Sequence, residues 1–161
     1  ADVVHAGKAL YIGVSEWNAD QIRAGHQLAR ELGIQLISNQ PQYSMLWRVI
    51  EGKVVPASEE LGISQIVWSP LAQGKIADDA VIGEIAKAHG KTNGQITLRW
   101  IIQQGVIAIP RTAKESRAAE NFGIFDFELS ADEMARISAL ARPDGRIGDW
   151  LDEAFQWDQD A

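Results

Sequence analysis

The sequence contains no cysteine, only three histidines and no long apolar segment. The absence of cysteine excludes a disulfide framework and any thiolate metal site. The histidines, His5, His26 and His89, are far apart and none has a ligand-type residue four positions away, so we expect no metal site. No apolar run approaches the roughly 18 residues that a membrane span needs, and residues 1–30 lack the pattern of a signal peptide. We therefore expect a cytoplasmic protein without a membrane segment.

Positive charge is also scarce. The 15 lysines and arginines are outnumbered by 22 aspartates and glutamates, which gives a formal net charge of −7. Such a chain has no broad attraction to nucleic acids or anionic membranes, so we expect neither as a partner. What the sequence does have is 46% hydrophobic residues over 161 positions, enough for one packed core. We expect a single domain over residues 1–161, with a C-terminal arm, 143–161, that packs on the body through Trp150, Phe155 and Trp157.

Short apolar runs alternate with segments of helical spacing. Asn18 is a helix-capping residue, Gly33 is a typical helix end, and Ser130 with Glu133 has the spacing of a capping box. The expected helices lie between Asn18 and Gly33, between Val49 and Gly62, and over residues 80–89, 92–104, 114–122 and 131–141. The expected strands are residues 9–14, 34–38, 63–69 and 106–110.

This alternation favours an α/β fold with a parallel sheet, because parallel strands need crossover connections and helices that cover the sheet. A closed (β/α)8 barrel takes about 250 residues, so four βα units in this chain would form half of a TIM barrel. A small doubly wound sheet with helices on both faces is the alternative. The periodicity does not choose between the two architectures.

The most specific local pattern follows the fourth expected strand. Ile109-Pro110-Arg111-Thr112 leads into an expected helix that carries Arg117 and Asn121. A helix N-terminus offers unpaired N–H groups, and two arginines beside it would complete a pocket for a phosphate group. The alternative interpretation is that both arginines are solvated surface residues.

Four motifs, taken in order, resemble the aldo-keto reductases, which are nicotinamide-dependent carbonyl reductases built on the (β/α)8 barrel. Residues 7–15, 39–40, 68–71 and 109–121 are similar to the family's strands five to eight and the segments that follow them. The part up to Gly74 resembles the potassium-channel β-subunit-like branch, and residues 75–161 resemble the diketogluconate reductase-like branch. This difference predicts a chimera joined near Gly74.

The resemblance implies an NADP(H) site with three parts. On the nicotinamide it places Ser15, Asn39, Gln40 and Trp68, the last stacked on the ring. Along the pyrophosphate it places the loop with Leu71, Gln73 and Gly74, and Ser69, which follows Trp68, is also an expected cofactor-binding residue. On the adenosine 2′-phosphate it places Arg111, Thr112 and Arg117, with Asn121 on the adenine.

Two departures from the family pattern bear on the expected chemistry. Glu16 stands where the family usually has asparagine or arginine, and its carboxylate would add negative charge near the cofactor. The family's catalytic aspartate, tyrosine, lysine and histidine lie on strands two to four, and none of those motifs is present. The two tyrosines, Tyr11 and Tyr43, have no lysine or histidine that sequence context places beside them. We therefore assign no catalytic residue and expect no appreciable reduction of an aldehyde or ketone by the isolated chain.

Three functions stay open on this basis. The chain is a truncated reductase that binds NADP(H) without turnover, a self-associating structural module without a ligand, or an active reductase with a replacement proton donor such as Tyr43. A half barrel leaves one face of its sheet and two strand edges uncovered, and burial of each large apolar side chain is worth about 1.5–3 kcal/mol. Two copies related by a twofold axis could close eight strands. We therefore expect a homodimer or a larger homo-oligomer.

Overall fold

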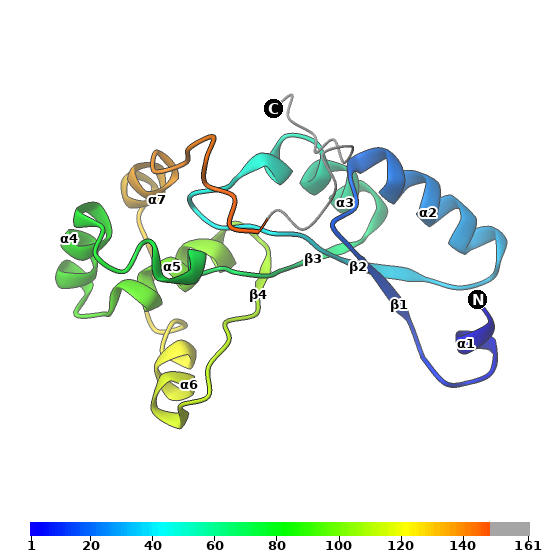
Figure 1. Ribbon diagram of the computed structural model, residues 1–161, viewed down its shortest axis with the longest axis horizontal. Coiled ribbons are helices and arrows are strands. Elements are labelled where there is room, and N and C mark those ends of the chain that lie inside the picture. The colour runs from blue at the N-terminus through cyan, green and yellow to red at the C-terminus, as the bar shows by residue number, and fades with distance from the viewer. Residues whose placement is uncertain (149–161) are drawn as a thin grey trace. The chain divides into compact units, whose positions relative to one another are not determined.

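The computed structural model describes residues 1–148 (Figure 1). The aromatic residues of the expected arm, Trp150, Phe155 and Trp157, lie outside the described residues. Within the described part the chain divides into two compact units. The first unit consists of residues 1–41 and 49–67, and the second consists of residues 42–48 and 68–148. The chain therefore crosses between the units three times.

The first unit is a parallel three-stranded sheet with helical crossovers. Its elements are α1 (Asp2–His5), β1 (Ile12–Ser15), α2 (Ala19–Glu31), β2 (Leu36–Gln40), η1 (Val49–Glu51), α3 (Val54–Leu61) and β3 (Ser64–Val67). β2 lies between β1 and β3 and pairs with both in parallel. α2 packs against β2 and α3, and it buries Ile22 and Ala29. The α/β class and the parallel pairing expected from the sequence are confirmed.

The ends of α2 follow the expected local signals. The side-chain oxygen of Asn18 accepts a hydrogen bond from the Gln21 N–H at 2.9 Å, and Gln21 Oε1 accepts one from the Asn18 N–H at 3.0 Å. Gly33 adopts a left-handed φ of 67°, which glycine tolerates without steric cost. The expected helix start and stop are both confirmed.

The strand boundaries differ from the expected ones by a few residues. β1 begins at Ile12 rather than residue 9, because pairing with β2 begins where the Ile12 N–H donates to the Gln35 carbonyl. Leu10 and Tyr11 precede this point and are 84% and 54% exposed. β4 (Ile107–Ala108) is shorter than the expected 106–110, which agrees with the missing N–H of Pro110.

The second unit packs its helices around a buried tryptophan. Its elements are η2 (Ala72–Gly74), α4 (Ala80–His89), α5 (Asn93–Gln103), β4, α6 (Glu115–Phe122) and α7 (Ala131–Ser138). Trp100 of α5 is fully buried, and Tyr43 stacks on it with the ring centroids 5.5 Å apart. The Trp100 indole N–H donates to Ser138 Oγ at 3.2 Å. Segment 42–48, which lies outside the expected helices and strands, thus contributes to this core through Tyr43.

The capping box expected at the start of α7 is confirmed. The Ser130 hydroxyl accepts from the Glu133 N–H at 3.3 Å, and Glu133 Oε2 accepts from the Ser130 N–H at 2.8 Å. α7 ends at Ser138 rather than residue 141. Its last turn tightens, because the N–H groups of Leu140 and Ala141 bond to carbonyls only three residues earlier.

Glu133 also joins the start of α7 to the end of α4. His89 Nε2 lies 2.8 Å from Glu133 Oε1, and the Ser130 hydroxyl donates to Oε2 at 2.9 Å. Burial of Glu133 disfavours its charged form, but the hydrogen bonds from Ser130 and His89 outweigh burial and lower the pKa of Glu133 below its usual 4.5. A carboxyl group with a lowered folded-state pKa stabilises the fold above its unfolded-state pKa and loses that contribution as the pH falls through the folded-state value.

We expect the urea midpoint of unfolding to decrease as the pH falls below 4.5, and Glu133→Gln to reduce that decrease. The measurement is a series of urea unfolding curves at several pH values. Asp132→Asn, a neighbouring exposed carboxylate in the same helical turn, serves as the matched control. The same pH dependence in the Glu133→Gln variant and the unaltered chain would contradict the prediction.

Candidate functional site

In the first unit, the expected nicotinamide residues lie at the carboxyl ends of neighbouring strands. Ser15 of β1 is the register partner of Gln40 of β2, and both side chains are exposed. Ser15 Oγ donates to the Gln40 carbonyl at 2.8 Å, and the Glu16 N–H donates to the same oxygen at 3.3 Å. The structure therefore brings Ser15 and Gln40 together and leaves the Gln40 amide exposed.

Asn39 belongs to a buried hydrogen-bond network instead. Its side-chain oxygen accepts from the Trp17 N–H at 3.3 Å, and its amide nitrogen donates to the Trp17 carbonyl at 3.3 Å and to Gln65 Oε1 at 3.2 Å. Gln65 in turn donates to Ser58 Oγ at 2.6 Å. Both amide hydrogens of Asn39 are thus engaged by the protein, so this side chain holds the loop after β1 in place. Its expected contact with the nicotinamide stays a prediction.

In the second unit, the expected pyrophosphate residues lie on a loop with unusual backbone conformations. Ser69, Ala72 and Gln73 have φ values of 52°, 47° and 52°, in the left-handed region that non-glycine residues rarely adopt. Gly74 follows with φ 85°. Trp68, Ser69 and Leu71 are partly buried, whereas Gln73 and Gly74 are exposed.

Such backbone strain is concentrated at functional sites more often than elsewhere. In the first unit, Glu16 has φ 60° immediately after β1, beside the Ser15–Gln40 pair. All the left-handed non-glycine residues among residues 1–148 therefore occur directly after β1 or in the segment that follows β3. The composition and spacing of the sequence gave no sign of this feature.

The expected phosphate residues lie on the segment that leads into α6 and on α6 itself. Thr112 Oγ1 accepts from the Lys114 N–H at 3.0 Å, in the turn that precedes the helix. Arg111 and Arg117 are exposed, and within residues 1–148 neither side chain forms a hydrogen bond or ion pair. Asn121 is half-buried on the wall of an apolar cavity. Two arginines without a protein partner near a helix N-terminus could bind a phosphate group.

The two tyrosines differ in exposure and in position. Tyr43 is 1% exposed and stacks on Trp100. Tyr11 is 54% exposed and lies just before β1, at the opposite end of that strand from Ser15. The replacement donor considered above, Tyr43, is therefore inaccessible to a substrate in this structure.

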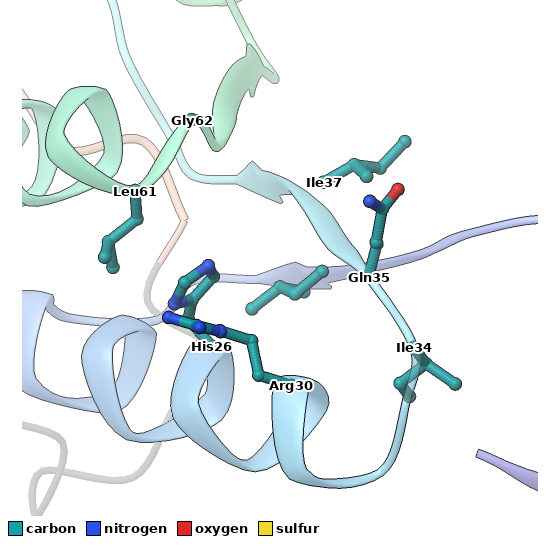
Figure 2. Close-up of a pocket in the computed structure, with 8 residues that line it drawn as sticks. His26, Arg30, Ile34, Gln35, Ile37, Leu61 and Gly62 are labelled. Atoms are coloured by element: carbon teal, nitrogen blue, oxygen red, sulfur yellow. The ribbon is translucent and has the colours of Figure 1, made fainter.

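A separate cavity of about 320 Å³ lies where β2 begins, at the opposite end of that strand from Gln40. Figure 2 shows His26 and Arg30 projecting from α2, and Leu61 projecting from the end of α3. His26 and Arg30 also line an adjacent cavity, in which the two arginines, Arg23 and Arg30, are balanced by two carboxylates, Glu31 and Glu60. None of the expected cofactor residues lines either cavity, and this mixture of charges indicates no ligand class.

Two further findings concern the described part of the chain. Among residues 1–148, no group of three acidic or histidine side chains is arranged to hold a metal ion. No helix in this range has both the length and the hydrophobicity of a membrane span.

Two residues that support Asn39, Gln65 and Ser58, were not predicted from the sequence. They are 26 and 19 residues away from Asn39 in the sequence, and no local pattern marks them.

Comparisons with known proteins identify the family of the chain. The model of the aldo/keto reductase family matches residues 1–142. The chain is 38% identical to a glyoxal reductase of Bacillus subtilis (strain 168) over 91% of this chain and 51% of that protein. It is 32% identical to a 9,11-endoperoxide prostaglandin H2 reductase of Trypanosoma cruzi (strain CL Brener) over 96% of this chain and 53% of that protein. The chain thus spans about half the length of the curated relatives it matches.

Solved structures also match this chain over about half of their own length. A putative 2,5-diketo-D-gluconic acid reductase B superposes with a TM-score of 0.89 and 39% identity, covering 98% of this chain and 54% of the other. A mutant of Gox0644 in complex with NADPH superposes with a TM-score of 0.80 and 30% identity, covering 92% of this chain and 53% of the other.

Proposed function

Since the chain belongs to the aldo/keto reductase family, we propose that it provides the NADP(H)-binding part of a carbonyl reductase and does not itself contain the proton donor. Its fold is half of the family's (β/α)8 barrel, as the coverage of about half of each matched structure indicates. The substrate class that follows from the family is an aldehyde or a ketone. The whole reaction would need residues that the 161-residue chain does not supply.

The observation that carries the proposal is that Arg111, before α6, and Arg117, in its first turn, have no hydrogen-bond or ion-pair partner within residues 1–148. In a protein surface with excess negative charge, cations usually find carboxylates, yet Arg111 and Arg117 have no partner within residues 1–148. A 2′-phosphate would supply two negative charges and several acceptor oxygens for them. The N-terminal N–H groups of α6 would add to this attraction.

At the nicotinamide end, the support comes from Gln40. Its exposed amide can both donate to and accept from a carboxamide, which is the complementarity that such a ligand requires. Asn39 would act indirectly, since its amide holds the backbone of Trp17. When bound, NADPH would supply the hydride for reduction, and the residues named here would orient it.

The test is a titration of NADPH and NADH fluorescence with the chain and with Arg117→Gln. Loss of a charge-assisted contact, worth about 1.5–3 kcal/mol, should weaken NADPH binding by roughly 10–100-fold. NADH lacks the 2′-phosphate, so its affinity should change little. Arg142→Gln is the matched control, because it replaces an exposed arginine that pairs with Asp144. It should leave the affinities for NADPH and NADH unchanged. The absence of NADPH binding at millimolar concentration, or equal losses for both nucleotides, would overturn the proposal.

A further inference from the structure

α6, which carries Arg117 and Asn121, has little apolar packing to fix its position. Within the described residues, none of α6 is buried, and the side chain of its N-cap residue, Lys114, makes no capping hydrogen bond. Figure 1 shows the helix apart from α4 and α7. Burial of an apolar face is what usually fixes a helix in a protein. Polar contacts must therefore contribute to the position of α6.

Gln95 joins the start of α5 to the end of α6. Its amide nitrogen, Nε2, donates to the Glu120 carbonyl and to the Gly123 carbonyl, both at 3.0 Å. Its amide oxygen accepts from the Thr92 N–H at 3.0 Å. Carbonyls in the last turn of a helix have no following turn to bond with, so a donor from another element can hold that end in place. Both amide hydrogens of Gln95 are used in this way.

Gly123 permits the close approach of Gln95 to α6. A Cβ atom at position 123 would lie 2.7 Å from Gln95 Nε2 and 3.3 Å from the Glu120 carbonyl oxygen. The first distance is well inside van der Waals contact, so the Gln95 amide would have to move away. The two hydrogen bonds from Gln95 to the end of α6 therefore depend on glycine at this position.

Thr92, the N-cap residue of α5, holds the side chain of Glu120. Its hydroxyl donates to Glu120 Oε1 at 2.5 Å and accepts from the Gln95 N–H at 3.3 Å. Glu120 is the only acidic residue three or four positions from Arg117 in the sequence, the spacing at which helical side chains pair. Among residues 1–148, however, Arg117 has no hydrogen bond or ion pair, and the Glu120 carboxylate bonds to Thr92 instead.

We propose that Thr92 and Gln95 are positioning residues for the 2′-phosphate site of NADP(H), an inference that rests on the function proposed above. Gln95 fixes the end of α6 and, with it, the distance of Arg117 from Arg111. Thr92 holds the Glu120 carboxylate away from Arg117, so that the guanidinium stays available to a phosphate group. A carboxylate beside Arg117 would neutralise the arginine and repel the phosphate. All the contacts involved lie within the second unit.

The test measures the dissociation constants of NADPH and NADH for each variant by fluorescence titration. Their ratio isolates the 2′-phosphate, because contacts with the rest of the nucleotide cancel. Thr92→Val removes the hydroxyl and should reduce the preference for NADPH about fivefold, the effect of a unit charge brought to about 4 Å from another in water. Thr92→Ser keeps the hydroxyl and should keep the preference. The double variant Thr92→Val/Glu120→Gln removes the competing charge and should restore it.

Gln95→Leu and Gly123→Ala should each reduce the NADPH preference as well, because both remove the hydrogen bonds to the end of α6. Thr97→Val is the matched control, since the Thr97 hydroxyl donates to the Asn93 carbonyl within α5, at 2.8 Å. It should leave the preference unchanged. Circular dichroism verifies that each variant is folded. Thr92→Gly also lacks the hydroxyl but keeps an acceptable N-cap residue, and it replaces Thr92→Val if that variant unfolds.

The outcomes separate this inference from the proposed function. If Arg117→Gln weakens NADPH binding but Thr92→Val and Gln95→Leu keep the preference, the proposed function stands and the positioning role is wrong. Equal losses of NADPH and NADH affinity in these variants would show a purely structural role and would overturn the inference too. So would a double variant Thr92→Val/Glu120→Gln that does not recover the preference. A chain that does not bind NADPH at all would overturn both.

Discussion

NADPH mixed with the 161-residue chain and a reactive aldehyde is expected to be consumed no faster than in the absence of protein. Transfer of hydride to a carbonyl leaves an alkoxide, and a positioned acid that protonates it typically contributes a factor of 10²–10⁴ to the rate. The tyrosines are the natural candidates, but Tyr43 is 1% exposed beneath Trp100 and Tyr11 precedes β1 at the end away from Ser15. With NADPH bound, neither tyrosine would therefore protonate the alkoxide that hydride transfer leaves.

The assay follows the loss of NADPH absorbance, with the full-length glyoxal reductase of Bacillus subtilis as the positive control. Turnover at rates typical of enzymes, abolished by Tyr43→Phe or Tyr11→Phe, would contradict the prediction and identify a replacement proton donor. Turnover that survives both substitutions would contradict it as well, and would point to a donor other than a tyrosine. NADPH binding measured on the same sample separates loss of chemistry from loss of cofactor.

The parts of the fold that could be predicted from the sequence are those fixed by local chemistry. The capping signals at Asn18 and Ser130 and the stop at Gly33 depend on residues within one helical turn, and all are confirmed. The predicted starts of the strands were less accurate, because the first residue of a strand is set by where its hydrogen bonds to the neighbouring strand begin. Ile12 meets that condition through Gln35, which is 23 residues away in the sequence.

Two features of the structure depend on contacts too distant for sequence patterns to reveal. Segment 42–48 lies outside every expected helix and strand, yet Tyr43 stacks on Trp100 and the Leu46 carbonyl accepts from the Arg142 N–H at 3.1 Å. The expected single domain over 1–161 gave no hint that the chain crosses between two compact units at these points. The chimeric joint near Gly74 stays a prediction, and one solved structure covers both sides of it with 39% identity over 98% of the chain.

The candidate site shows the same division between local and distant effects. The motif around Arg111 and Arg117 is contiguous, so the sequence could place both arginines beside a helix start, and the structure has them there. Asn39 and Gln40 are both expected cofactor residues because of the family resemblance, and that expectation stays a prediction. The hydrogen bonds of Asn39 to Trp17 and Gln65 span 22 and 26 residues, and only the folded sheet brings those groups to it. A strand places successive side chains on opposite faces, so Asn39 is buried where Gln40 is exposed.

Trp100→Ala is expected to lower the free energy of unfolding of the second unit by about 3–5 kcal/mol, the usual cost of removing a fully buried large aromatic side chain. The indole fills the centre of this unit, where it contacts Tyr43, lies 5.7 Å from the Arg48 guanidinium and donates to Ser138. Its removal leaves a cavity and an unsatisfied hydroxyl, and a domain has only about 5–15 kcal/mol of net stability.

Urea unfolding followed by circular dichroism, with hydrogen exchange of the α5 amides, measures this effect. Trp100→Phe keeps the stacking on Tyr43 and loses only the hydrogen bond and part of the volume, so its loss of stability should be intermediate. Phe125→Ala removes a ring that is 69% exposed and serves as the control, with a change below about 1 kcal/mol in the folded monomer. Equal stability of Trp100→Ala and Phe125→Ala would mean that the core of the second unit does not depend on Trp100, and that segment 42–48 is held by other contacts.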